Sequence, residues 1–368
     1  MEKEIVTNKQ VICLMILFIM GSTLVLGVGA EAKQDSWIAI LTATAVAIMI
    51  VLIYSRILWL FPGKDLFQIL ELILGKYVGK VVSLLFIWYA FHLGVLVIRN
   101  FSEFMKVVAL LETPELVSAL ILVLLCIWGV KEGIEVLGRW SQFVLPLLLA
   151  IILTTIILSL KMADWTNIRP IMYNSFGPIT KAAFSVFSFP FAETVVFMMI
   201  LSGAKDQKGY YMIYLKSILI GGLIVLIINI RNIVVVGHEF ITNTAFPSYA
   251  AVSLINVGEF LQRIEILVSV VFLFAGFIKI SICLLAVSNG VARVLNITQY
   301  RTLVTPIGLI MLSLSLIIYD SIMEMQEWAF IYYKFYALPF QVIMPVIIWS
   351  LCEIKVKRGE TKKLAKNA

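Results

Sequence analysis

Residues 36–55 read SWIAILTATAVAIMIVLIYS, an uninterrupted run without Asp, Glu, Lys or Arg. Residues 140–160 and 302–319 are uncharged in the same way. A run of about 18 or more apolar residues is long enough to cross the hydrocarbon core of a bilayer as a helix. The whole chain of 368 residues is 61% hydrophobic and 14% charged, with a mean hydropathy of +1.02. Soluble proteins average about 45–50% apolar and about 25% charged residues. The chain is therefore predicted to be an all-α polytopic membrane protein, and soluble enzymes, secreted disulfide scaffolds and disordered tails are excluded.

Ten apolar segments predict ten transmembrane helices within a single domain, residues 1–368. Helix is required because backbone groups that face lipid must be satisfied within their own segment. The predicted spans cover approximately residues 10–30, 36–55, 79–104, 115–130, 140–160, 181–203, 209–235, 264–289, 302–320 and 335–353. The connections at 56–80 and 237–263 are long enough for short helices at the membrane interface.

The distribution of Lys and Arg predicts the orientation, because cytoplasmic loops carry an excess of them. With the N-terminus inside, the inside segments hold 19 of these residues and the outside segments hold 8. Both termini are therefore expected in the cytoplasm, with residues 354–368 as a basic cytoplasmic tail. This bias accounts for the net charge of +7, so no nucleic-acid partner is expected.

Two predicted helices are interrupted at corresponding places. The first contains Gly21-Ser22-Thr23, and the sixth, five helices later, contains Phe189-Pro190-Phe191. Paired breaks of this kind are typical of inverted-repeat transporters with a binding site at mid-membrane. We predict a 5+5 inverted repeat with discontinuous helices 1 and 6: repeat one over residues 10–160 (helices 1–5) and repeat two over 181–353 (helices 6–10). The alternative is that Gly and Pro are simply frequent in membrane helices.

The second break leads directly into a carboxylate, Glu193. Pro190 lacks an N–H and clashes with the carbonyl four residues earlier, so backbone groups are freed beside this carboxylate. Together with Ser188, Phe189 and Phe191, they could bind a small zwitterion. Alternatively, Glu193 caps the freed amides of a kinked helix. The two interpretations are compatible.

The first break supplies small side chains and two hydroxyls. A half-helix that begins at Gly21, Ser22 and Thr23 would present partial positive charge to a substrate carboxylate. Small residues that only permit close helix packing are the competing interpretation. The matching break in helix 6 favours binding.

Lys279 lies deep within the eighth segment, and nothing nearby in sequence neutralises it. It could stand in place of the sodium ion that often bridges helices 1 and 8 in permeases of this architecture, or it could titrate and couple transport to protons. The alternative is a structural ion pair with Glu193 or a free carbonyl. The sequence leaves both open.

Arg99 and Glu103 share one face of the third segment, with His92 two turns earlier. They could line a polar cavity in which Arg99 meets an anion and takes part in coupling. The slightly favoured alternative is that Glu103 neutralises Arg99 near the outer interface. His92 is expected to be a hydrogen-bonded structural residue rather than a proton relay.

The sequence contains no set of residues with the chemistry of an enzyme. Its four Cys lie far apart, its two His cannot form a multi-His centre, and no nucleophile–base set is visible. We expect no catalytic residues, no metal and no cofactor.

At this point the chain resembles a known family, the B subunit of the spore germinant receptor, which belongs to the amino-acid/polyamine/organocation permease superfamily with its LeuT-like fold. The resemblance covers nearly the whole chain. It rests on the break at residues 21–23, on Phe189-Pro190-Phe191-Ala192-Glu193, on Phe246-Pro247-Ser248-Tyr249, and on residues 258–265 leading to Lys279. Ala192 stands where glycine is often expected, a departure that could narrow the pocket.

The resemblance implies a nutrient sensor in the inner membrane of dormant bacterial spores, in complex with an A subunit and a lipoprotein C subunit. Binding of a germinant, typically an amino acid and sometimes a sugar or nucleoside, would trigger ion release and germination. The germinant is expected between the two breaks and helices 3 and 8. A proton-coupled amino-acid permease is the alternative, and a ligand-opened conduit for ions or water within the receptor is compatible with sensing.

Overall fold

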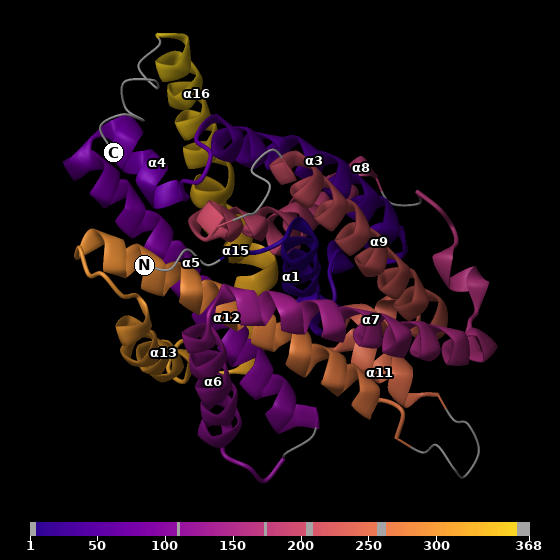
Figure 1. Ribbon diagram of the computed structural model, residues 1–368. Helices are drawn as coiled ribbons and strands as arrows, with labels where there is room; N and C mark the ends of the chain where they lie inside the picture. Colours follow the sequence, from indigo (N-terminus) through magenta and orange to yellow (C-terminus); the bar gives the residue numbers. More distant parts are fainter. Residues whose placement is uncertain (1–4, 109–110, 173–174, 204–208, 256–262, 359–368) are drawn as a thin grey trace.

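The computed structural model describes residues 5–108, 111–172, 175–203, 209–255 and 263–358, and all regular structure within these ranges is helical (Figure 1). The α-helices are α1 (Asn8–Met20), α2 (Thr23–Leu26), α3 (Ser36–Leu60), α4 (Leu66–Leu74), α5 (Lys76–Val108), α6 (Glu115–Glu132), α7 (Ile134–Ser159), α8 (Phe176–Val186), α9 (Tyr210–Val236), α10 (His238–Thr242), α11 (Pro247–Ser253), α12 (Ile266–Val294), α13 (Arg301–Ser315), α14 (Ile322–Glu327), α15 (Tyr333–Leu338) and α16 (Met344–Lys357). The 3-10 helices are η1 (Ala30–Asp35), η2 (Leu160–Met162), η3 (Trp165–Ile168), η5 (Ala192–Met199) and η6 (Leu201–Gly203), and the π-helical turns are η4 (Phe187–Phe191), η8 (Trp328–Tyr332) and η9 (Pro339–Ile343). Residues 359–368 of the predicted tail and 258–262 of the loop that carries the resemblance lie outside the described ranges.

Eight helical stretches in the described ranges are long and apolar enough to cross a membrane: Asn8–Leu26, Ala30–Leu60, Lys76–Val108, Ile134–Met162, Phe176–Met199, Tyr210–Val236, Ile266–Val294 and Ile322–Lys357. The other two predicted spans correspond to α6, which contains Glu115, Lys131 and Glu132, and to the shorter α13. The count of ten transmembrane helices therefore stays a prediction.

Two predicted boundaries near the C-terminus are wrong. The last helix begins at Ile322 rather than near residue 335, and α13 ends at Ser315 rather than near residue 320. The first turns of the last helix carry Glu324 and Glu327, so hydropathy understates the helix there. Part of this segment lines a cavity rather than lipid, as described below.

Short-range signals start and stop several helices. Thr7 and Gln10 form a capping box at the start of α1, and Asp65 and Gln68 form another at the start of α4. Such pairs satisfy amide groups that a helix N-terminus leaves unbonded. Helix α4 lies within the connection at 56–80, where a short helix was predicted.

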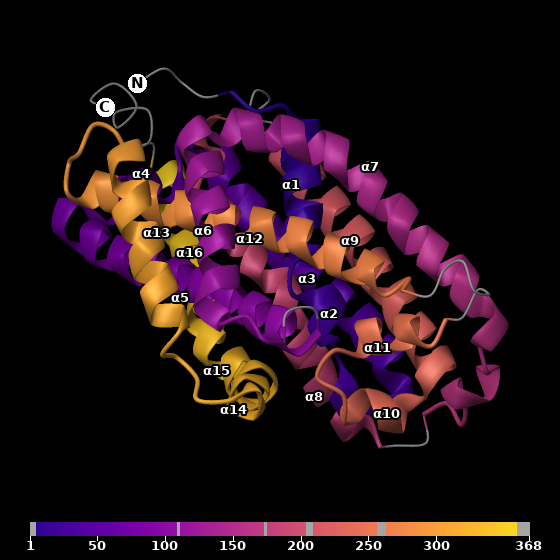
Figure 2. The ribbon, with the colours of Figure 1, turned by 90° about the horizontal axis from the view of Figure 1, so that it is seen from below.

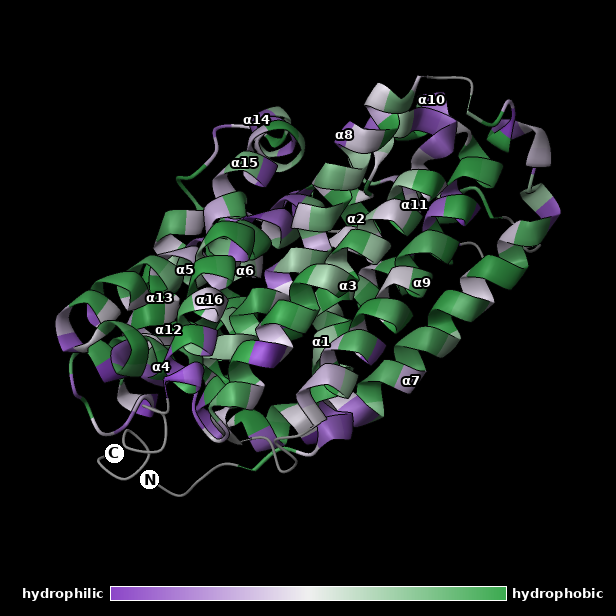
Figure 3. Cartoon of the chain, turned by 90° about the horizontal axis from the view of Figure 1, so that it is seen from above, coloured by the Kyte–Doolittle hydropathy of each residue, from purple (hydrophilic) through white to green (hydrophobic). Residues whose placement is uncertain are grey.

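The two broken helices occupy the interior of the bundle. In the most apolar stretch of each, 83% of the residues are buried, against 28% for Ile134–Met162 and for the last helix. Figure 2 shows α1 enclosed by other helices and α7 along the outer edge. Hydrophobic residues cover the lengths of α3, α7 and α9, whereas hydrophilic ones gather mainly toward helix ends and at α10 (Figure 3). This is the distribution expected of a protein immersed in a bilayer.

Four pairs of helices that lie five spans apart pack against each other. The contacts join α1 to η5, α3 to α9, α5 to α12, and α6 to α13. These are spans 1 with 6, 2 with 7, 3 with 8 and 4 with 9, the pairing expected of two related halves. Both breaks are thereby brought to the centre, next to α5 and α12.

Candidate ligand-binding site

The first helix is interrupted as predicted. Helix α1 ends at Met20 and α2 begins at Thr23, with Gly21 at φ −2° and ψ −110° between them. The Thr23 hydroxyl donates to the Ile19 carbonyl at 2.8 Å, so it satisfies an acceptor at the end of α1. The hydroxyl of Ser22 is buried without a hydrogen-bond partner among the described residues.

Gly21 is needed for the space that it leaves. A Cβ at this position would lie 2.5 Å from Cδ of Lys279, which extends from α12 toward the break. Real Cβ atoms do not approach other atoms so closely. The absent side chain of Gly21 therefore lets the aliphatic stem of Lys279 pass beside the first helix.

The sixth helix is interrupted by a π-helical turn. Helix α8 ends at Val186, Phe189 has extended angles (φ −128°, ψ 108°), and the chain continues as the 3-10 helix η5. Because Pro190 has no N–H and the regular ladder is lost, carbonyl groups here turn to side chains. The Ser188 carbonyl accepts from Gln341 at 2.9 Å, and the Ala192 carbonyl accepts from Tyr54 at 3.4 Å.

Lys279 and Glu193 meet between the two breaks. The Lys279 Nζ lies 2.5 Å from Glu193 Oε2, and both side chains are fully buried. The same ammonium lies 4.9 Å from the ring centroid of Phe189 and 5.1 Å from that of Phe18. Aromatic faces attract a cation when it is withdrawn from water. Lys279 thus has the partner that the ion-pair interpretation named.

A chain of polar side chains runs from Glu193 into the last helix. Tyr333 donates to Glu193 Oε1 at 2.7 Å, and its oxygen lies 3.1 Å from that of Tyr89 on α5. The Gln341 amide donates to Tyr89 at 2.8 Å, and Ser188 donates to the Gln341 Oε1 at 2.9 Å. Glu193 is therefore held on both oxygens, and the hydroxyl of Ser188 is already engaged.

The polar chain includes residues that sequence reasoning missed: Tyr89, Tyr333 and Gln341. Gln341 lies inside an apolar segment, where a polar side chain is costly and marks an internal contact, so it could have been found. The tyrosines could not, because a tyrosine in a membrane helix is equally common at the lipid–water boundary.

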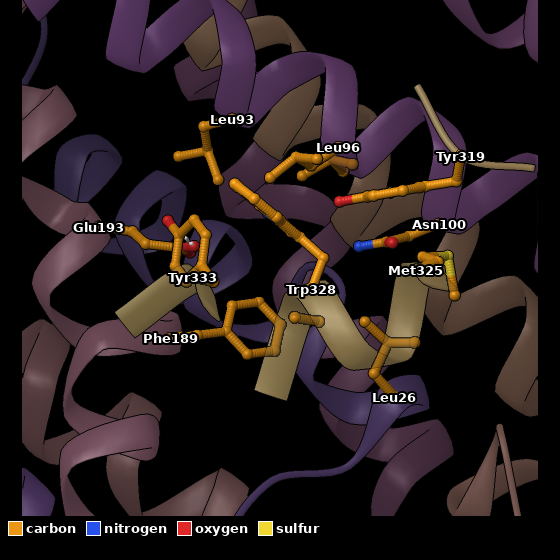
Figure 4. A pocket seen from close by; sticks show the side chains of 12 residues that line it. Leu26, Leu93, Leu96, Asn100, Phe189, Glu193, Tyr319, Met325, Trp328 and Tyr333 are labelled. Carbon is orange, nitrogen blue, oxygen red and sulfur yellow. Dashed lines mark hydrogen bonds between the residues drawn. The ribbon is translucent and has the colours of Figure 1, made fainter. Parts of the chain in front are cut away.

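A cavity adjoins Glu193. It is lined by Leu26, Leu93, Leu96, Val97, Asn100, Phe189, Glu193, Tyr319, Met325, Trp328, Ala329 and Tyr333. In Figure 4, Glu193 and Tyr333 lie at one end, Asn100 and Tyr319 at the other, and Trp328 reaches between them. The cavity therefore has an acidic end and mostly apolar walls.

The predicted site residues divide into two groups around this cavity. Phe189 and Glu193 are among its lining residues. Gly21, Ser22, Thr23, Ser188, Pro190 and Phe191 are buried or packed in the breaks behind it, and Lys279 lies between the two groups through its contacts with Glu193 and Gly21. Helices 1, 3 and 6 all contribute side chains to the lining of the cavity. Lys279 of helix 8 is not a lining residue, but it contacts the lining residue Glu193.

Arg99 and Glu103 form a separate ion-pair network. Arg99 Nη2 lies 2.6 Å from Glu103, and Nη1 lies 3.0 Å from Glu115 on α6, which also binds Lys106 at 2.8 Å. The guanidinium is therefore neutralised, as the favoured interpretation proposed, and neither Arg99 nor Glu103 lines the cavity. Their part in coupling stays a prediction.

His92 differs from its prediction. Its Nδ1 has no hydrogen-bond partner among the described residues, and the ring packs among Trp88, Trp328 and Tyr336, with centroids 5.0–5.9 Å apart. The expectation of a hydrogen-bonded histidine was wrong for this nitrogen, because aromatic neighbours from the last helix occupy its surroundings.

The sequence matches the family model described as spore germination protein (spore permease) over residues 5–322. The chain belongs to this family. Among similar proteins, spore germination protein KB of Bacillus subtilis (strain 168) is 29% identical over 368 residues, covering 99% of this chain and 98% of that protein. Spore germination protein A2 of the same organism is 26% identical, covering 89% and 88%. Spore germination protein XB of Bacillus anthracis is 21% identical, covering 87% and 90%.

Solved structures show that this chain has a transporter fold. It resembles MHP1, a nucleobase-cation-symport-1 family transporter in a closed conformation with bromovinylhydantoin bound, with a TM-score of 0.69, 16% identity, and coverage of 93% of this chain and 78% of that one. It also resembles MhsT in complex with L-phenylalanine, with a TM-score of 0.67, 11% identity, and coverage of 95% and 99%. The fold is therefore the LeuT-like inverted-repeat fold, and the chain is a multi-pass membrane protein of the germinant-sensing or transport class.

Proposed function

We propose that this chain is the germinant-sensing membrane subunit of a spore germinant receptor. It binds a small nutrient, an amino acid, at mid-membrane and signals to A and C subunits, which leads to ion release and germination. Its place is the spore inner membrane, with both termini in the cytoplasm. The observation that carries this proposal is the fully buried Lys279–Glu193 pair where the two broken helices meet a cavity.

The chemistry of the pair supports a zwitterionic ligand. Two charges withdrawn from water remain stable only while each is paired. An amino acid that enters between them brings an ammonium for Glu193 and a carboxylate for Lys279, so both charges keep a partner. Tyr333 remains available to hold the second oxygen of Glu193. In this arrangement the ion pair occupies the place where the ammonium and carboxylate of the ligand bind. The ligand therefore separates Lys279 from Glu193 when it enters.

The walls of the cavity support an apolar side chain on this ligand. In Figure 4, Leu93 lies beside the acidic end, and Leu96 and Trp328 lie between that end and Tyr319. Pockets that bind small molecules are mostly apolar with a few polar groups that fix orientation. An aliphatic or aromatic L-amino acid meets both conditions, whereas a sugar would leave several hydroxyls against these walls. Gly21 of the first break, which Ser22 and Thr23 follow, lies beside the stem of Lys279, the residue that would bind the ligand's carboxylate.

Separation of the pair gives the signal a physical route. Lys279 belongs to α12 and Glu193 to η5, so the distance between these two elements changes when a ligand enters. A ligand shifts a conformational balance only by its differential affinity for the two states. Here the difference arises because the unliganded state is stabilised by the ion pair and the liganded state by ligand contacts.

Binding is tested by thermal unfolding of the purified chain in lipid nanodiscs with a panel of L-amino acids, sugars and nucleosides. We expect one or more apolar L-amino acids to raise the melting temperature saturably, and Glu193→Gln and Lys279→Met to remove that rise. Glu353→Gln is the matched control, because it breaks the Arg56–Glu353 ion pair, which lies in neither break. A response to sugars or nucleosides alone, or an unchanged amino-acid response in Glu193→Gln, would contradict the proposed ligand.

Sensing itself is tested in spores that carry the same variants. Glu193→Ala and Lys279→Ala should abolish the germination response although the protein still inserts, and Glu353→Gln should retain it. A normal response in correctly assembled Glu193→Ala or Lys279→Ala spores would refute the role of the pair.

A proton-coupled amino-acid permease is the second candidate, and the fold shared with MHP1 and MhsT favours it. The two functions differ in what the chain does alone. Counterflow of labelled amino acid in liposomes that contain only this chain would support transport. Binding without counterflow would support sensing.

A further inference from the structure

Arg231, near the end of α9, is a buried cation that has no partner among the residues that the structure describes. Its side chain is 6% exposed, and neither Nε nor Nη1 has a hydrogen-bond partner among the described residues. Arg99, by contrast, binds two carboxylates. Buried charges are paired in stable proteins, so an unpaired guanidinium indicates a missing anion.

Arg231 lines a second cavity, separate from the one at Glu193. This cavity is lined by Leu24, Ile151, Ile152, Thr155, Ile228, Arg231, Ser248, Val268 and Val271. Its polar groups are one guanidinium and two hydroxyls, and no carboxylate is among its lining residues. A ligand in this pocket can form charged hydrogen bonds to the guanidinium and place its apolar part against the aliphatic side chains.

The hydroxyls are positioned rather than free to move. Ser248 accepts a hydrogen bond from Asn232 at 3.0 Å, which leaves its own proton available to an acceptor. Thr155 donates to the Ile152 carbonyl at 2.8 Å, so its oxygen can only accept. Arg231 and Ser248 together therefore offer donors to an anion.

We infer that the cavity lined by Arg231, Ser248 and the aliphatic residues of α7, α9 and α12 binds a short-chain organic monocarboxylate. The carboxylate accepts from the guanidinium, whose planar fork matches two carboxylate oxygens. The alkyl chain lies against Ile151, Ile228 and Val268. An inorganic anion would leave this aliphatic wall unused, and the ammonium of an amino acid would find no carboxylate there.

The two cavities are complementary and share a wall. The first has Glu193 as its charged lining residue, and the second has Arg231. Leu26 of α2 lines the first and Leu24 lines the second. Residues two apart on a helix point about 200° apart, so the short helix α2 separates the two sites. The monocarboxylate site is thus distinct from the proposed amino-acid site.

The test uses the purified full chain in lipid nanodiscs, titrated with sodium butyrate against sodium chloride at equal ionic strength. We expect a saturable rise in melting temperature with butyrate and none with butyramide, which has the same shape without the charge. Arg231→Gln should weaken the apparent affinity at least about tenfold, because a hydrogen-bonded charge is lost. Arg263→Gln is the matched control, since its side chain is 66% exposed.

Two further variants keep the outcome decisive. Ser248→Ala removes the second donor and should weaken butyrate binding even if Arg231→Gln fails to fold. Glu193→Gln should leave the butyrate response intact, which separates this site from the first cavity. The inference is overturned if the wild-type protein shows no saturable shift, if chloride produces the same shift as butyrate, or if Arg231→Gln and Arg263→Gln respond alike.

Discussion

The Lys279 ammonium lies 2.5 Å from a carboxylate oxygen of Glu193, and both side chains are excluded from solvent. The two residues are 86 positions apart in sequence and come from α12 and the broken sixth helix. The stem of Lys279 also passes through the space left by Gly21 in the broken first helix. One ion pair therefore joins three elements at the centre of the bundle, and each charge depends on the other for its stability there.

Removal of one charge of the Lys279–Glu193 pair should destabilise the protein more than removal of both. Lys279→Met or Glu193→Gln alone is expected to lower the free energy of unfolding by about 3–5 kcal/mol, because a buried charge is left unpaired or a buried donor loses its acceptor. The double variant Lys279→Met/Glu193→Leu should cost less than either. Melting temperatures of the purified proteins measure the order.

The partly exposed pair Arg56–Glu353 is the control for these variants. Its side chains are 35% and 25% exposed. Glu353→Gln should therefore cost only about 0–1 kcal/mol. If the variant Lys279→Met/Glu193→Leu loses as much free energy of unfolding as the two single variants together, the two central charges do not depend on each other.

A methyl group at Gly21 should disturb the same centre sterically. Gly21→Ala places Cβ 2.5 Å from Lys279 Cδ and 2.9 Å from the Phe18 carbonyl oxygen. Overpacking of this kind costs about 1–3 kcal/mol. Gly276→Ala is the control, because no atom lies within 4 Å of its added Cβ. Equal melting temperatures for the two variants would refute the packing role of Gly21.

The hydroxyl of Tyr333 should stabilise Glu193. Tyr333→Phe removes a 2.7 Å hydrogen bond to this carboxylate, and hydrogen bonds to charged groups contribute about 1.5–3 kcal/mol. The neighbouring Tyr332 donates to Glu327 at 3.2 Å in an exposed position, so Tyr332→Phe should have a small effect. The measurement is thermal unfolding of both variants, and a larger loss from Tyr332→Phe would contradict the importance of the buried bond.

Trp328 should limit the size of the ligand. Its indole reaches across the cavity between Glu193 and Asn100 (Figure 4). Trp328→Ala is expected to enlarge the cavity and shift the preference toward bulkier amino acids in the thermal-shift panel. Trp128→Ala, at a residue 65% exposed, should leave the preference unchanged. An identical ligand profile for the wild type and Trp328→Ala would exclude this role.

Much of the fold could be predicted from local sequence. Apolar runs such as residues 36–55 become helices because lipid offers their backbone groups no partner. The breaks at Gly21 and Pro190 could also be predicted from local sequence. Glycine allows backbone angles that other residues avoid, and proline lacks the N–H that a helix needs. The start of the last helix was missed because Glu324 and Glu327 reduce its hydropathy.

The side chains that contact one another within the bundle were harder to predict from the sequence. For Lys279 the sequence indicated only that a partner was required, with Glu193 as one of two candidates. His92 was expected to form hydrogen bonds, yet residues more than 230 positions later, Trp328 and Tyr336, surround it with rings. Arg231 is one of the eight basic residues counted in the outside segments, and only the packing of α7, α9, α11 and α12 shows that it is buried.

The amino-acid sequence alone determined the helical membrane class, the two interrupted helices and the need to neutralise Lys279, because each depends on the energy of a residue in lipid. Only the tertiary structure decided that Tyr333 and Gln341 complete the polar chain at Glu193, that Arg99 is satisfied by Glu115, and that Arg231 is not satisfied by any described residue. These depend on which helix faces lie together, and helix packing in a membrane is set by the fit of side chains across the whole bundle rather than by any single segment.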